Sequence, residues 1–130
     1  MPTHSPTKAT LQAAILPSLI LLLVLFMLTG CEMGLAMFLG ARDREIKEST
    51  HAVESARNDV ARAKAYSTRA VAYSEKARYS REFKLIRANE YERLLSLAHK
   101  DHDEAVKLNP DSSEMYFNRG QTITIAAVWI

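Results

Sequence analysis

The feature that most constrains this chain is the absence of glycine and proline between Gly40 and Pro110. Glycine and proline are the residues that most often interrupt helices and form turns. The whole 130-residue chain contains only four of each, too few for a loop-rich or all-β protein. Because a chain of this length supports one small domain at most, we expect a single all-α body.

Charge is distributed unevenly on the two sides of Cys31. Of the 17 lysines and arginines only Lys8 precedes it, and all 15 acidic residues follow it. The body after Cys31 is therefore nearly neutral, which gives no electrostatic reason to expect nucleic acid as a partner. One cysteine cannot form an internal disulfide, so composition leaves the redox compartment open.

An uninterrupted apolar run of ten residues, Leu19 to Leu28, follows a polar and weakly basic start. A secretory signal has an apolar centre of about 7–15 residues, whereas a membrane-spanning helix needs about 20. The run fits the first pattern, and counting back to Ala13 extends it toward the second. An uncleaved single-pass anchor continued by Met33–Gly40 is therefore an alternative, although Glu32 would interrupt it.

The four residues LTGC, Leu28 to Cys31, close that run and resemble the lipobox of bacterial lipoproteins. In a lipobox, small residues lie extended in a protease, and the cysteine thiolate accepts a diacylglyceryl group. The resemblance implies cleavage between Gly30 and Cys31, then acylation of the new amine. Three acyl chains would hold the protein durably to a membrane, since each buried methylene contributes about 0.8 kcal/mol. Because Glu32 rather than Asp follows the cysteine, the resemblance favours the periplasmic face of the outer membrane.

Residues 41–80 carry a stripe of small and apolar side chains at helical spacing. Two series recur every seven positions, the second three residues further along: Ile46, Val53 and Val60, then Ala56, Ala63, Ala70 and Ala77. This spacing predicts one long helix of about 35–40 residues. Alanine on the stripe favours close approach of a partner helix.

A break is expected near Ser80, which we take as the cap of a second helix that runs to Leu108. That helix should end there because Pro110 restricts the backbone of the residue before it. Asp111 then has the position of an N-cap, and a third helix begins near Ser112.

The segment AHKDHDEAVKLNPDSSEMYFNRGQ, residues 98–121, resembles a junction between tetratricopeptide (TPR) repeats. The matching residues are two small positions, a closing proline, and the aromatic and close-packing glycine of the next first helix: Ala98, Ala105, Pro110, Tyr116 and Gly120. Residues 65–80 resemble an earlier first helix, with alanine in place of its glycine. Tyr66 and Tyr116 are 50 positions apart, whereas one repeat has about 34 residues. An insertion is therefore expected between the matched parts.

The resemblance implies a non-catalytic protein–protein interaction module without a cofactor. Such modules bind a peptide or a partner's helix on the concave surface of their first helices. The corresponding residues here are Tyr66, Arg69, Tyr73, Tyr116, Asn118 and Arg119. Asn118 and Arg119 are the residues that we most expect to contact a partner, because long polar side chains there can reach a partner's backbone.

The number of repeats is a difficulty, because about three are usually needed for stability. The one and a half repeats of this chain would leave apolar side chains uncovered at its end: Ile123, Ile125, Val128, Trp129 and Ile130. We expect them to pack back, to be covered by another chain, or to mark a truncated version of a longer protein, and we favour truncation.

No residue pattern in the chain predicts catalysis. His99 and His102 have helical spacing for a metal but lack a third ligand, so a solvated helix face is the simpler interpretation. There is no glycine-rich phosphate loop and no nucleophile motif. We therefore expect neither an enzyme nor a metal or cofactor site.

The expected order along the chain is a lipoprotein signal (1–30), a lipidated cysteine and linker (31–43), a helical stalk (44–64) and a TPR-like region with an insertion (65–130). The leading hypothesis is a lipid-anchored scaffold that binds an unknown protein or peptide. The alternative is a helical stalk that self-associates through its alanine stripe into a homo-oligomer.

Overall fold

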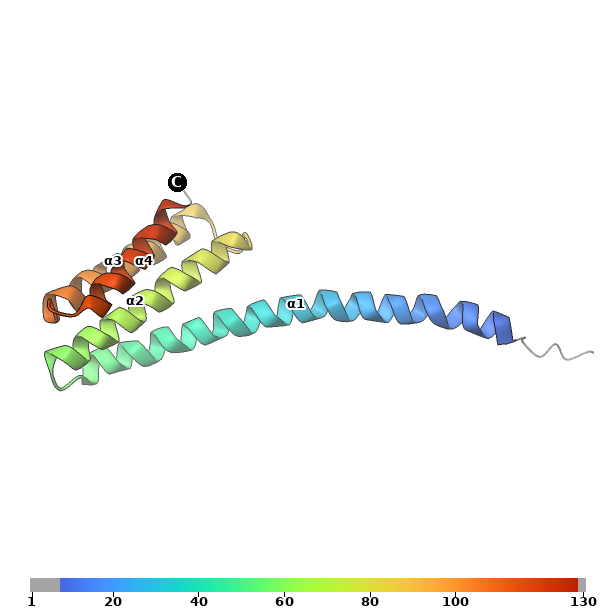
Figure 1. Ribbon diagram of the computed structural model, residues 1–130, viewed down its shortest axis with the longest axis horizontal. Helices are drawn as coiled ribbons and strands as arrows, with labels where there is room; N and C mark the ends of the chain where they lie inside the picture. Colours follow the sequence, from blue (N-terminus) through green and yellow to red (C-terminus); the bar gives the residue numbers. More distant parts are fainter. Residues whose placement is uncertain (1–7, 129–130) are drawn as a thin grey trace, which may run out of the picture. The chain divides into compact units, whose positions relative to one another are not determined.

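The computed structural model describes residues 8–128, apart from the side chains of residues 8–16 and 28–32. Over this range it contains four α-helices and no strand, which confirms the all-α fold class (Figure 1). The helices are α1 Lys8–Ser55, α2 Asp59–Glu82, α3 Ala88–Leu108 and α4 Ser113–Ala127. The chain divides into a first unit, Met1–Met37, and a second unit, Phe38–Ile130, and α1 contributes residues to both.

The first unit contains the apolar run. Its side chains from Leu19 to Met27 are all exposed, from 49% at Val24 to 78% at Phe26. The lipobox side chains, 28–31, lie outside the described part of the chain. Among the helical residues that are described, no stretch is both long and apolar enough to cross a membrane.

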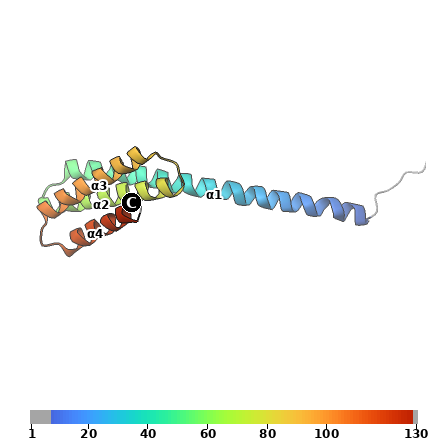
Figure 2. The same ribbon diagram turned by 90° about the horizontal axis from the view of Figure 1, so that it is seen from above.

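The second unit is a bundle in which successive helices run antiparallel. Helix α2 returns along the α1 segment from Phe38 to Ser55, α3 returns along α2, and α4 turns back beside both α2 and α3 (Figures 1 and 2). Helix α2 is central, since it contacts α3 and α4 and is joined to α1 by contacts such as the tilted ring pair Phe38–Tyr79.

Helix α2 can occupy the centre because its buried side chains are all small. They are alanines and serines: Ala63, Ala65, Ser67, Ala70, Ala72, Ser74, Ala77 and Ser80. The positions 63, 67, 70, 74 and 77 follow the four-and-three spacing of one helix face. Ala65 and Ala72 lie on a second face, so neighbouring helices can approach α2 closely from two sides. The predicted burial of the stripe is confirmed for Ala63, Ala70 and Ala77, whereas Val60 is 62% exposed.

The prediction of one long helix over 41–80 is wrong, because the chain turns between α1 and α2. Asn58 has an extended backbone and caps α2, its Oδ1 accepting from the Ala61 N–H at 2.8 Å. Arg62 Nη2 donates to the Ala56 carbonyl oxygen at 3.2 Å and so covers the end of the turn. These local bonds outweigh the seven-residue periodicity that runs through the segment.

The turn also changes the predicted division of the chain. It falls inside the stalk expected at 44–64, whose two parts lie on different helices. The backbone of residues 31–43, expected to be a linker, is helical within α1. The body of the protein therefore includes the end of α1.

Helix α3 starts at Ala88, later than the expected cap at Ser80, because α2 continues to Glu82. Lys84 has φ 55°, and the Leu85 N–H donates to the Ser80 carbonyl oxygen at 2.7 Å. This left-handed residue and its bond form a Schellman motif that ends α2. The predicted end of α3 at Leu108 is confirmed. The N-cap position of α4 is Ser112, one residue after the expected Asp111, and its side chain makes no capping hydrogen bond.

The apolar core lies between α2, α3 and α4. Its buried members are Ala77, Tyr91, Leu94 and Leu95, against which Tyr73, Ile86, Ile125 and Ala126 pack. The two small positions predicted in α3, Ala98 and Ala105, are fully buried. The core thus depends on large side chains from α3 meeting small ones from α2.

The outer face of α4 differs from the prediction. A Cβ built on Gly120 would meet no atom within 4 Å, so the expected close-packing role of this glycine is wrong. No described helix covers this side of α4, where Ile123 is 51% exposed and Val128 is 70% exposed. Ile125 packs back against the core, which was one of the three alternatives for these side chains, and residues 129–130 lie outside the described range.

Replacement of Ala70 by leucine tests the close packing of α2. Ala70 is fully buried, so Ala70→Leu should lower the free energy of unfolding by about 1–3 kcal/mol through overpacking. The control Ala61→Leu changes an exposed site on the same helix and should stay within about 0.5 kcal/mol. Urea unfolding followed by circular dichroism measures both. Equal effects of the two changes would contradict the central position of α2.

Candidate functional site

Arg69 of α2 joins three helices through one guanidinium group. Its Nε and Nη2 donate to the two carboxylate oxygens of Asp101 on α3, at 2.6 and 2.8 Å. Its Nη1 donates to Thr50 Oγ1 on α1 at 3.2 Å. The hydrogen bond to Asp101, which is only 4% exposed, holds the pKa of Arg69 above its ordinary value. A bidentate charged pair of this kind fixes both side chains, so Arg69 sets how α1, α2 and α3 pack.

A second buried polar contact joins α3 to α4. His102 is fully buried and Thr122 is 1% exposed, and His102 Nε2 and Thr122 Oγ1 share a hydrogen bond of 2.9 Å. The other ring nitrogen, Nδ1, has no hydrogen-bond partner. Burial lowers the pKa of His102 to about 4, so the imidazole is neutral at neutral pH.

The solvated face predicted around His99 and His102 is therefore wrong in part. Asp101 and His102 are buried, whereas Asp103 is exposed. The reason is that α3 packs on α2 and α4 at the same level, so two adjacent residues of α3 each meet a neighbouring helix. Within residues whose side chains are described, no group of three or more histidine, cysteine or acidic residues could hold a metal ion.

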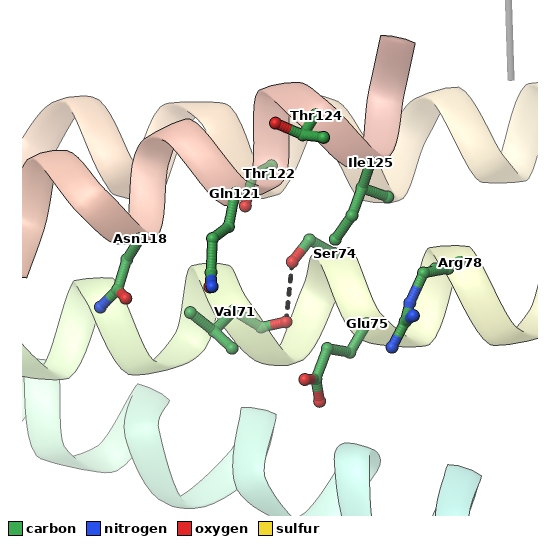
Figure 3. Close-up of a pocket in the computed structure, with 9 residues that line it drawn as sticks. All are labelled: Val71, Ser74, Glu75, Arg78, Asn118, Gln121, Thr122, Thr124 and Ile125. Atoms are coloured by element: carbon green, nitrogen blue, oxygen red, sulfur yellow. Dashed lines mark hydrogen bonds between the residues drawn. The ribbon is translucent and has the colours of Figure 1, made fainter. Parts of the chain in front are cut away.

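A groove with a volume of about 340 Å³ lies between α2 and α4 (Figure 3). It is lined from α2 by Val71, Ser74, Glu75 and Arg78, and from α4 by Asn118, Gln121, Thr122, Thr124 and Ile125. Figure 3 shows the amide groups of Asn118 and Gln121 extending from α4 toward α2. A second hollow of about 300 Å³ shares Arg78, Thr124 and Ile125 and continues to Val128. The groove therefore follows most of α4.

The two charged residues of the groove differ in how they are paired. Glu75 accepts from Arg42 Nη1 of α1 at 2.7 Å, which balances its charge. The guanidinium of Arg78 stacks on its neighbour Tyr79, with Cζ 4.3 Å from the ring centroid. The buried Nε of Arg78 has no hydrogen-bond partner within the described structure. Within the described residues Glu75 is therefore charge-paired, whereas Arg78 forms no ion pair with an acidic side chain.

The predicted partner-binding residues of α2 hold the bundle together in this structure. Arg69 is committed to Asp101, and its Cζ lies 5.4 Å from the ring centroid of Tyr66. Tyr73 packs against the apolar core. None of the three lines the groove between α2 and α4.

The three predicted partner-binding residues of α4 face different surroundings. Asn118 lines the groove, and its Nδ2 donates to Ser67 Oγ on α2 at 3.0 Å. Arg119 faces α3 instead and forms an ion pair of 3.0 Å with Asp103. Tyr116 is 49% exposed and lies outside the groove lining.

Sequence reasoning missed most of the groove. Val71, Glu75 and Arg78 are spaced as a third face of α2, distinct from its two small-residue faces. That spacing could have been noticed in the sequence. Its meaning depends on α4 lying beside α2, which no local pattern indicates.

No protein-family model, no curated protein and no solved structure matches this chain. The lipobox and TPR resemblances therefore stand only on the residues quoted for them.

Replacing the carboxylate of Asp101 tests the contact that joins the helices. Asp101→Asn leaves the guanidinium of Arg69 without its counter-charge, so the free energy of unfolding should fall by about 3 kcal/mol. The control Asp103→Asn removes an exposed pair with Arg119 and should cost less than about 1 kcal/mol. Urea titration measures both.

The double variant Arg69→Met, Asp101→Leu provides the complementary measurement. It removes both charges together and should recover most of the stability that Asp101→Asn loses. A loss for Asp101→Asn as small as that for Asp103→Asn would contradict this role of the pair.

Proposed function

We propose that this protein is a bacterial lipoprotein whose helical body binds an extended peptide of a partner protein in the groove between α2 and α4. The observation that carries the proposal is the groove itself, whose lining combines the side-chain amides of Asn118 and Gln121, the guanidinium of Arg78 and the apolar side chains of Val71 and Ile125. The role is that of a non-catalytic scaffold.

The lining of the groove suits a peptide backbone. Side-chain amides such as those of Asn118 and Gln121 donate and accept hydrogen bonds at the same time, as a peptide group does. Val71 and Ile125 offer an apolar surface to a side chain of the ligand. Arg78 adds donors for a carbonyl or carboxylate oxygen.

The length of the groove is also suitable. From Asn118 to Val128 the lining of α4 extends over about 15 Å, at a rise of about 1.5 Å per residue. An extended peptide rises about 3.3 Å per residue, so about five residues of a partner would fit along it.

The side chains of the first unit support the proposal of a lipid anchor. A helix that is apolar on every side requires a nonpolar environment, and the side chains from Leu19 to Met27 are apolar and exposed. The LTGC sequence follows them directly. We propose cleavage before Cys31 and acylation of that cysteine, which would place the body on the periplasmic face of the outer membrane.

The alternative of a self-associating stalk has less support. Ala63, Ala70 and Ala77 are fully buried against helices of the same chain, so they do not form an exposed stripe. The groove lining, in contrast, contains exposed side chains such as Gln121.

Metabolic labelling with palmitate tests the anchor. In bacterial cells that express the full chain, the wild type should incorporate label and Cys31→Ser should not. The control Thr29→Ala keeps a small residue in the lipobox and should be labelled. Mass spectrometry should find a chain that begins at an acylated Cys31. A labelled Cys31→Ser variant, or a wild type that retains Met1 and a bare Cys31, would exclude the lipoprotein.

Peptide selection tests the groove. Peptides selected on the purified chain from a random library should lose about tenfold or more in affinity for the Asn118→Ala, Gln121→Ala double variant, which removes hydrogen bonds worth about 1 kcal/mol each. Lys107→Ala, on the exposed side of α3, should bind them unchanged. Fluorescence anisotropy measures both. Peptides that bind the two variants alike would show that the groove is not their site.

A further inference from the structure

Helix α4 is attached to the bundle by few buried side chains. Among the described residues α2 buries eight and α3 buries seven, whereas α4 buries only Met115 and Thr122. Its other polar contacts are less buried: Asn118 Nδ2 donates to Ser67 Oγ at 3.0 Å, Tyr91 Oη donates to the Ile125 carbonyl oxygen at 3.5 Å, and Arg119 pairs with Asp103 at the surface. The hydrogen bond between His102 and Thr122 is thus the most buried polar contact that α4 makes.

The surroundings of His102 suit only its neutral form. It is fully buried and its Nδ1 has no partner, so a proton on that nitrogen would be left without water or an acceptor. The charged or titratable groups that act on it are His99, Asp101 and Asp103 from α3 and Arg119 from α4. From α2, Arg69 binds Asp101 and so balances the carboxylate next to the imidazole.

We propose that protonation of His102 loosens α4 from α2 and α3, so that the groove is held more weakly in acid than at neutral pH. Release would expose the imidazolium to water and remove one wall of the groove, which consists of residues of α4. The regulatory meaning of this step rests on the proposed function. The step itself depends on the burial of His102 beneath the docked α4 and on its contact with Thr122, and it requires no bound peptide.

The direction of the pH effect follows from the docked geometry. With α4 docked, burial lowers the pKa of His102 from 6.5 to about 4. The released state therefore binds more protons between these pH values, and docking weakens as the pH falls through this range. These two pKa values predict an increase of about 20-fold in the opening constant of α4 between pH 7 and pH 5.

Hydrogen exchange with mass spectrometry on the full chain in detergent measures this opening. After correction for intrinsic exchange rates, protection of residues 113–127 should fall about 20-fold from pH 7 to pH 5, while protection of α2 changes much less. His102→Gln does not titrate and should abolish the difference in α4. The control His99→Gln, at a less buried position of the same helix, should retain it.

Three results would overturn the proposal. They are unchanged protection of α4 in acid, an equal loss in α2 and α4, and a His102→Gln variant that keeps the wild-type response. If His102→Gln does not fold, the wild-type comparison of α4 with α2 decides alone. Failure of peptide binding would leave the result standing, because hydrogen exchange requires no peptide.

Discussion

The small side chains of α2 are the constraint on which the rest of the structure depends. An α-helix that buries only alanine and serine contributes little apolar area of its own, but it lets neighbouring backbones approach closely. The large side chains that fill the core, such as Tyr91 and Leu94, therefore come from α3. Helix α2 is a surface against which other helices pack, and it leaves a third face free for the groove. The small side chains of α2 therefore determine both where the core forms and where the groove lies.

Close approach alone would not specify which helix lies where, because alanine surfaces are nearly uniform. The buried polar contacts supply that specificity. Arg69 meets Asp101 and Thr50 at one level of the bundle, and His102 meets Thr122 nearby along α3. An unpaired charge or hydroxyl in these positions would be costly, so each contact disfavours a shifted packing of the same helices. The two contacts differ in chemistry: the first joins opposite charges, and the second depends on a neutral imidazole.

The sequence was sufficient to predict the all-α fold, the burial of Ala63, Ala70 and Ala77, and the end of α3 before Pro110, because these features depend on local spacing and on proline geometry. The turn at Asn58 and the Schellman motif at Lys84 were missed, since both are made by single residues within a continuous helical periodicity. The burial of Asp101 and His102 was missed for another reason. In the sequence they are part of a charged segment, and only their partners on α2 and α4 distinguish them from surface residues. Of the groove, Asn118 was predicted, whereas Arg78 and Gln121 depend on the return of α4 along α2.

That return of α4 is the central claim, because the groove and the acid response both require it. It can be tested directly with one engineered disulfide. Asn118 and Ser67 are joined by a hydrogen bond of 3.0 Å across the two helices, so cysteines at these positions would face each other. In a chain with Ser67→Cys, Asn118→Cys and Cys31→Ser, the account predicts nearly complete intramolecular cross-linking under mild oxidation at neutral pH. A chain that stays reduced, or that forms only intermolecular dimers, would show that α4 does not lie on α2.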